Sequence, residues 1–102
     1  MINQVNISKR AEKSLMTVPK HIAAKFLYWK LEVEEHGIEV VRKISSYHDE
    51  PLKGKFQGAV RSIRLAQGYR AYYRTIGTTV KCILVEEVNH HDYKKLERLF
   101  GL

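Results

Sequence analysis

The order of apolar and polar residues predicts helices in the first half of the chain and strands in the second. Alternation over residues 2–7 predicts a short first strand. Ser8 is a suitable N-cap for a helix over Lys9–Met16. Pro19 suits the first turn of a second helix, because its missing N–H would have no partner there. Gly37 is expected to end that helix in left-handed geometry.

The second predicted helix carries one apolar stripe at the spacing i, i+4, i+7 and i+11. The stripe consists of Ile22, Phe26, Trp29 and Val33, and we expect Ala23, Leu27 and Leu31 to widen it. A base-stacking role for its aromatic residues is an alternative, but aromatic side chains at helical spacing favour a place in the core. Apolar residues at 38, 41 and 44 indicate a further helical turn or two.

From about residue 55 the spacing changes to that of strands. Residues rich in β-formers predict strands over Ala59–Leu65, Tyr69–Ile76 and Val80–Val88, joined by short glycine-containing turns. Helical spacing then returns over Asp92–Phe100. The predicted fold is α+β in the order β-α-α-β-β-β-α. It is an antiparallel sheet with two N-terminal helices packed on one face and a short C-terminal helix.

Length and composition narrow the class of protein. The chain of 102 residues favours a single domain, residues 1–102, and its 44% hydrophobic content argues against disorder. No apolar run approaches the ~18 residues of a membrane helix, and the start does not resemble a signal peptide, so a cytoplasmic location without membrane association is expected. Cys82 is the only cysteine and is interpreted as a small buried hydrophobe. The five histidines and this cysteine do not have the spacing of zinc ligands, so no metal site is expected.

The net charge of +7 is concentrated in the middle of the chain. Residues 42–81 hold nine basic and only two acidic side chains. A patch of this kind attracts a polyanion such as RNA. The alternative is a solvated surface that only aids solubility.

Strand alternation predicts where these charges lie. Ser62 and Arg64 share one face of their strand, and Arg70, Tyr72 and Arg74 share one face of the next. If the helices cover the more apolar face, a hairpin brings Arg64 and Arg70 together on the other one. Like charges on adjacent strands cost stability, so the pair is expected to hold an anion unless acidic side chains neutralise it.

Several segments in this order resemble the signature of the RelE/ParE toxin superfamily. They are Pro51-Leu52-Lys53-Gly54, Arg61-Ser62-Ile63-Arg64-Leu65 and Gly68-Tyr69-Arg70-Ala71-Tyr72-Tyr73. The end, from Val88 to Leu96, is similar to the close of the RelE-like and HigB-like branches.

The resemblance implies a toxin of a type II toxin–antitoxin system, with a cognate antitoxin as partner. RelE-like members cleave mRNA in the ribosomal A site, so a metal-independent endoribonuclease (an mRNA interferase) is expected, with the ribosome and mRNA as partners and no cofactor. A ParE-like inhibitor of DNA gyrase without nuclease activity is the alternative. A basic nucleic-acid-binding module that cuts nothing is a third class.

The resemblance also implies roles for individual residues. Arg64 and Arg70 match positions that stabilise phosphate, and Lys53 matches the basic position of the Leu-Lys-Gly loop. His91 or His90 is expected to act as acid or base, although the two histidines are alternatively polar residues at a helix start. Tyr93 is expected to stack on a base or orient the phosphate. The remaining RNA-binding candidates are Lys55, Arg61, Arg74 and His48. Ser62, where relatives often carry a basic residue, and histidine in place of an arginine near the last strand bring the chain nearer to the HigB-like branch.

Overall fold

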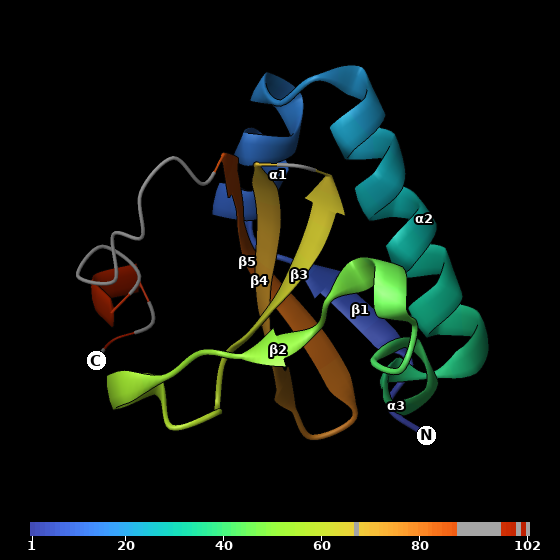
Figure 1. Cartoon of the computed structure of the whole chain (residues 1–102), viewed down its shortest axis with the longest axis vertical. Coiled ribbons are helices and arrows are strands. Elements are labelled where there is room, and N and C mark those ends of the chain that lie inside the picture. Colours follow the sequence, from blue (N-terminus) through green and yellow to red (C-terminus); the bar gives the residue numbers. More distant parts are fainter. Residues whose placement is uncertain (67, 88–96, 100, 102) are drawn as a thin grey trace.

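A five-stranded sheet in the order β1-β5-β4-β3-β2 forms the centre of the protein (Figure 1). The computed structural model describes residues 1–66, 68–87, 97–99 and 101. The strands are β1 (Gln4–Ile7), β2 (Glu50–Pro51), β3 (Arg61–Ala66), β4 (Tyr69–Ile76) and β5 (Thr79–Glu87). The helices are α1 (Lys9–Thr17), α2 (Lys20–His36) and α3 (Ile38–Val41), with the 3-10 turns η1 (Ser45–Tyr47) and η2 (Gly54–Phe56).

The sheet is mixed, whereas the sequence predicted an antiparallel one. Strands β3, β4 and β5 form the predicted antiparallel meander. Strand β1, however, pairs in parallel with β5, with Val5 opposite Val80 and Ile7 opposite Cys82. The α+β class is confirmed, but the predicted direction of the edge strand β1 is wrong. Residue alternation reports which face a side chain takes and not which neighbour a strand pairs with.

The predicted order of elements also lacked one strand. Strand β2 pairs with β3 through Glu50 opposite Ser62 and Pro51 opposite Arg61. Two residues give no detectable alternation, and proline cannot donate to a sheet, so no strand pattern marks it. The predicted closing helix over Asp92–Phe100 lies largely outside the described residues, but residues 97–99 within it are helical.

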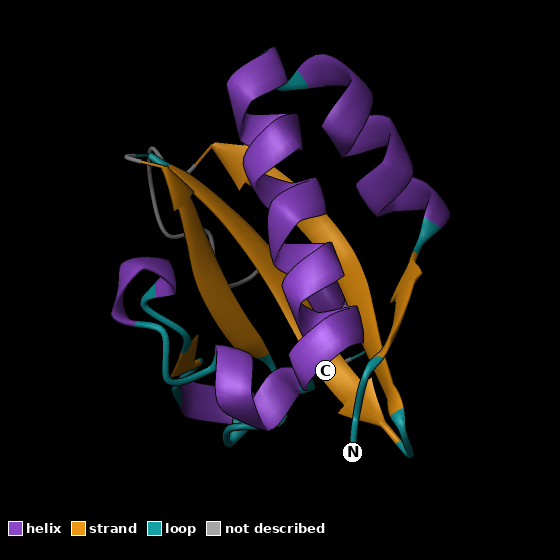
Figure 2. Cartoon of the chain, turned by 90° about the vertical axis from the view of Figure 1, so that its right-hand side faces the viewer, coloured by secondary structure: helices purple, strands orange, loops and turns teal. Residues whose placement is uncertain are grey.

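Helix α2 lies across one face of the sheet, with α1 beside it (Figure 2). Its predicted stripe of Ile22, Phe26, Trp29 and Val33 is fully buried. This stripe joins a core made by the sheet residues Ile63, Leu65, Ala71, Tyr73, Val80, Cys82 and Val85. Leu27 and Leu31, which were expected to widen the stripe, are exposed instead, and so is Tyr28. Alpha-helical geometry places them on the side of α2 that faces away from the sheet.

Two predicted helix ends are confirmed, whereas Pro19, expected in the first turn of α2, is its N-cap. Ser8 Oγ accepts a hydrogen bond from the N–H of Ala11 at 3.1 Å and donates to the carbonyl of Ile83 at 2.9 Å, so it caps α1 and ties it to β5. Gly37 adopts a φ of 86° at the end of α2, in the region that favours glycine. No helix in the described part of the chain is long and apolar enough to cross a membrane.

A smaller apolar cluster lies on the face of the sheet that α2 does not cover, which we call the open face. Leu52, Phe56 and Val60, from the loop after β2, pack with Tyr72 and Leu84 of the sheet. This loop crosses the lower part of the open face (Figure 1). Because Tyr72 lies between Arg70 and Arg74 on β4, the cluster separates the two arginines.

Candidate active site

Arg64 of β3 and Arg70 of β4 are neighbours in adjacent strands and share one face of the sheet, as the alternation predicted. Arg64 lies on the same face as Ser62, and Arg70 on the same face as Tyr72, whereas Ile63 and Ala71 face the main core. Arg64 is exposed and makes no hydrogen bond or ion pair with another described residue. Two guanidinium groups therefore share one part of the open face.

Two neighbours orient the Arg70 guanidinium. Its Nη1 donates to Glu50 Oε1 at 3.2 Å and to Ser62 Oγ at 3.1 Å. Ser62 is buried, so its hydroxyl accepts this hydrogen bond away from solvent. The other guanidinium nitrogens of Arg70 make no hydrogen bond within the described part of the chain. The planar fork of an arginine binds two oxygens of a phosphate, and Arg70 retains donors for such contacts.

Glu50 is the residue of this site that the sequence did not single out. Its side chain is 60% exposed, and it forms an ion pair with Arg70. A carboxylate thus partly neutralises Arg70, which is the alternative that the sequence left open for this pair of arginines. Arg64 has no ion pair among the described residues. A signal was present, because Asp49 and Glu50 are the only acids in residues 42–81 and directly precede the Pro-Leu-Lys-Gly segment.

A buried carboxylate supports the site from the other side of the sheet. The side chain of Asp49 is only 1% exposed. It accepts hydrogen bonds from Arg61 Nε at 2.6 Å and from the hydroxyl of Tyr73. Arg42 Nε in turn donates to the Tyr73 hydroxyl at 3.2 Å. These contacts hold the chain just before β2, and therefore the segment that carries Glu50.

The contacts with Asp49 raise the pKa values of both Tyr73 and Arg61. Burial raises the pKa of Tyr73, and the charge of Asp49 raises it further, while Arg42 opposes the shift. For Arg61, burial works against the charged form, but the hydrogen bond and charge of Asp49 raise its pKa overall. The Arg61 side chain therefore binds Asp49 on the face of the sheet that carries Tyr73 and the main core. It does not join Arg64 and Arg70 on the open face.

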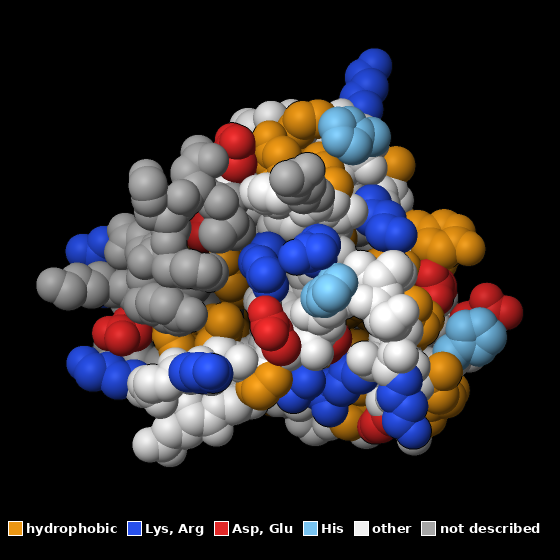
Figure 3. Space-filling view, viewed as in Figure 1, with side chains coloured by type: hydrophobic (Ala, Val, Ile, Leu, Met, Phe, Trp, Pro, Cys, Tyr) orange, Lys and Arg blue, Asp and Glu red, His pale blue; other side chains and the backbone are white. Residues whose placement is uncertain are grey.

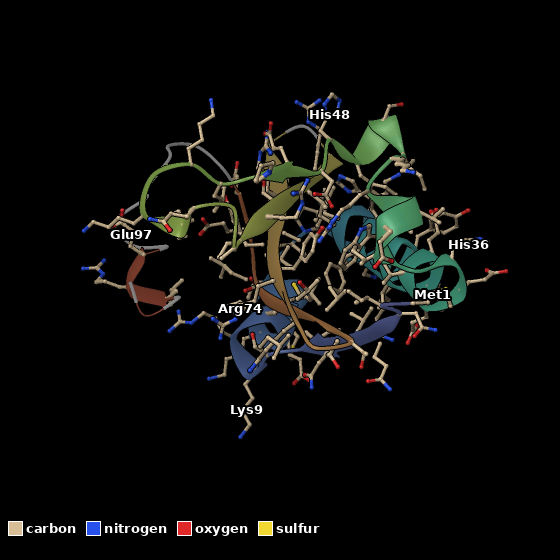
Figure 4. The ribbon with its side chains drawn as sticks, turned by 90° about the horizontal axis from the view of Figure 1, so that it is seen from below. Met1, Lys9, His36, His48, Arg74 and Glu97 are labelled. Atoms are coloured by element: carbon tan, nitrogen blue, oxygen red, sulfur yellow. The ribbon has the colours of Figure 1, made fainter. Side chains whose placement is uncertain are left out.

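The other predicted RNA-binding residues lie around the open face. Lys53 is exposed at the start of η2, and Lys55 forms a 3.7 Å ion pair with Glu97. Arg74 lies beyond the apolar cluster, and its buried Nε has no hydrogen-bond partner among the described residues. Figure 4 shows Arg74 well separated from His48.

His48 lies in the segment that leads into β2. Its backbone adopts a left-handed φ of 44°, at the end of η1, and its side chain is exposed. Figure 3 shows a histidine beside basic groups and an acidic group near the middle of the view. His48 is two residues before Glu50 and on the same side of the molecule as β2 (Figure 4).

His90, His91 and Tyr93 lie outside the described residues, so their predicted roles stay predictions. Among residues 1–66, 68–87, 97–99 and 101, no cluster of three histidine, cysteine or acidic side chains is arranged to hold a metal ion. Cys82 is fully buried, as predicted, and burial raises its pKa to about 12, so its thiol is protonated at neutral pH.

An open groove of about 720 Å³ lies elsewhere, between α1 and the adjoining ends of β4 and β5. Its charged residues are of both signs, with Lys9, Arg10 and Lys13 on α1 and Glu86 and Glu87 on β5. It does not include the arginine pair.

Solved structures define the class of this fold. No protein-family model and no curated protein matches the sequence. The structure is similar to that of RelE in the RelE–RelB complex of Pyrococcus horikoshii, with a TM-score of 0.66 and 23% identity over 88% of this chain and 99% of the other. YafQ of Escherichia coli matches with a TM-score of 0.67 and 12% identity, covering 84% and 93%. The toxin–antitoxin complex RelBE2 of Mycobacterium tuberculosis gives 0.63 and 21%, covering 85% and 99%.

These matches establish that the chain has the fold of the RelE-like toxins. The fold expected from the sequence resemblance is thereby confirmed. Because one fold supports several activities, the function must be argued from the site.

Proposed function

We propose that this protein is the toxin of a toxin–antitoxin pair and that it is a metal-independent endoribonuclease that cleaves mRNA in the ribosomal A site. The observation that carries the proposal is the pairing of Arg64 and Arg70 on the open face, with Glu50 at hydrogen-bonding distance from Arg70. The site thus combines donors for a phosphate with a carboxylate.

RNA cleavage without a metal needs three groups. A base takes the proton of the ribose 2′-OH, cations offset the charge that develops on the phosphate, and an acid protonates the leaving 5′-oxygen. In our proposal, Arg64 and Arg70 bind the phosphate. They are well suited to this because their positive charge exists before the substrate arrives and is fixed by the sheet.

Glu50 is the proposed base. Its carboxylate is exposed enough to meet a substrate, and its contact with Arg70 places it beside the phosphate that Arg70 would hold. His91 is kept as the proposed acid from the sequence, with His90 and His48 as the other candidates. Lys53 is assigned to the RNA backbone, because it is an exposed cation with no ion pair among the described residues. Tyr93 stays the proposed base-stacking group.

A cognate antitoxin is the proposed protein partner. The neighbours from Pyrococcus horikoshii and Mycobacterium tuberculosis are toxin–antitoxin complexes. Their shared fold supports the same kind of partner here. A segment with acidic side chains that covers Arg64 and Arg70 would block the proposed site.

Primer extension on mRNA held in purified ribosomes tests the proposal. The wild-type protein and Arg70→Ala are compared, with a lane of naked mRNA and with Lys43→Ala as a control that removes an equal charge from an exposed residue elsewhere. We expect cuts at A-site codons that need ribosomes, persist in Lys43→Ala and fall about 10²- to 10³-fold in Arg70→Ala.

The same protein preparation separates the competing functions. No cleavage in any lane, together with accumulation of gyrase-linked DNA breaks, would replace the nuclease by a gyrase inhibitor. Salt-dependent RNA binding without either activity would leave a nucleic-acid-binding module.

A further inference from the structure

Helix α2 presents an apolar stripe to solvent on the side opposite to its buried stripe. Leu27, Tyr28 and Leu31 are 51%, 61% and 60% exposed, and Ala24 beside them is also exposed. At 100° per residue, these four share one sector of the helix surface, opposite Phe26 and Trp29. Scattered exposed apolar residues need no explanation, but an aligned set on one helix face indicates a surface that a partner covers.

The charges at the ends of this stripe are arranged against the dipole of the helix. Lys20 and His21 are exposed in the first turn, which contains no acidic residue. Glu34 and Glu35 lie in the last turn, together with His36. Cations at the N-terminus and anions at the C-terminus are each unfavourable for an isolated helix. The internal pairs are limited, since Glu34 contacts Lys30 at 3.1 Å and Glu35 contacts only the neighbouring His36 at 3.9 Å.

We infer that the exposed face of α2 binds the same face of a second copy of this chain, with the two helices antiparallel about a two-fold axis between Leu27 and Tyr28. In that arrangement residue 27 of one copy faces residue 28 of the other, and residue 24 faces residue 31. The same symmetry places Lys20 of one copy beside Glu35 of the other. The apolar residues of the stripe thus face apolar residues, and the lysine faces a glutamate, as an interface between identical copies requires.

The antiparallel arrangement also resolves the conflict with the helix dipole. Each N-terminus, with its lysine and histidine, lies beside the acidic C-terminal turn of the partner helix. One face of a 17-residue helix is small for a stable dimer, so we expect a weak dimer whose affinity falls as salt rises.

Sedimentation velocity of the full chain tests this inference over a concentration series from low micromolar to near-millimolar. Arg70→Ala serves as the background, because the proposed function predicts that this variant is not toxic, and residue 70 lies in β4 and not in α2. We expect concentration-dependent dimerisation that Leu31→Asp weakens about tenfold or more. Ile76→Asp is the matched control, because Ile76 is a similarly exposed hydrophobic residue near the β4–β5 turn. A monomer at every concentration, or an equal loss in the control, would overturn the inference.

Exchanging the charges at residues 20 and 35 tests whether the two helices are antiparallel. Lys20→Glu and Glu35→Lys should each weaken self-association, whereas an equimolar mixture of the two variants should regain it, because both cross-helix pairs then have opposite charges. Failure of the mixture to associate more strongly than either variant would contradict the antiparallel pairing. Far-UV circular dichroism of each variant verifies that α2 stays folded. None of these measurements depends on nuclease activity, so the proposed function is not at risk from a negative result.

Discussion

Asp49 and Glu50 are adjacent carboxylates whose side chains bind arginines on opposite faces of the sheet. Asp49 is buried against Arg61 and Tyr73, and Glu50 reaches Arg70 on the open face. One pair holds the fold and the other belongs to the candidate site. The two positions therefore give separable predictions for stability and for activity.

Loss of the Asp49 charge should destabilise the fold. Asp49→Asn leaves the Arg61 guanidinium without its carboxylate partner, and we expect a loss of about 2–3 kcal/mol in the free energy of unfolding, somewhat below the cost for fully buried pairs because Arg61 is partly exposed. Urea denaturation measures it. Glu50→Gln, one residue away, is the matched control and should change stability by about 0–1 kcal/mol, as for exposed pairs. Equal effects at the two positions would contradict the assignment.

Glu50→Gln should instead reduce catalysis. The amide cannot accept a proton from the 2′-OH, so we expect ribosome-dependent cleavage to fall about 10²-fold or more. Binding of RNA should be retained or tightened, since a negative charge is removed beside Arg70. Single-turnover cleavage and a separate filter-binding measurement distinguish the two effects. Unchanged cleavage would remove Glu50 from the mechanism.

Substitution of Arg64 should stabilise the protein while it lowers activity. Arg64→Thr removes the like-charge contact with Arg70 and introduces a good strand former, so the free energy of unfolding should rise by about 0.2–1 kcal/mol. Arg70→Thr should give no such gain, because it also removes the contacts to Glu50 and Ser62. Chemical denaturation of both variants provides the test, and a destabilised Arg64→Thr protein would argue that Arg64 has a structural role.

Alkaline pH should destabilise the protein through Cys82. Burial raises the pKa of this thiol from about 9.0 to about 12, so between these values the unfolded chain releases a proton that the folded chain retains. The contribution is fully present below pH 9 and is lost as pH rises towards 12. Cys82→Ala should flatten the pH dependence of unfolding in that window. An unchanged slope would assign the alkaline loss to other groups, with Tyr73 as the next candidate.

The sequence predicted those features that depend on local periodicity. Alternation along two strands and a short connection sufficed to place Arg64 opposite Arg70. The buried stripe of α2 followed from helical spacing in the same way. In both cases the side-chain directions are fixed by the element itself and not by distant parts of the chain.

Features that depend on distant partners were missed. Glu50 joins the site because β2 pairs with β3, and a two-residue strand leaves no periodic signal. Leu27 and Leu31 were wrongly assigned to the core, although helical spacing alone places both opposite Phe26 and Trp29. The buried position of Asp49 was equally hidden, since charged residues are rarely buried unless paired, and the partner, Arg61, is twelve residues away.

The parallel pairing of β1 with β5 has a consequence for biosynthesis. Gln4–Ile7 are synthesised well before their pairing partners, Thr79–Cys82. The edge of the sheet cannot be completed until they emerge, and contacts between such distant residues slow folding. A nascent chain would thus carry the arginine pair before the sheet around it is complete. The interval between translation of β4 and closure of β1 on β5 is a period in which another protein could engage the newly made chain before its fold is finished.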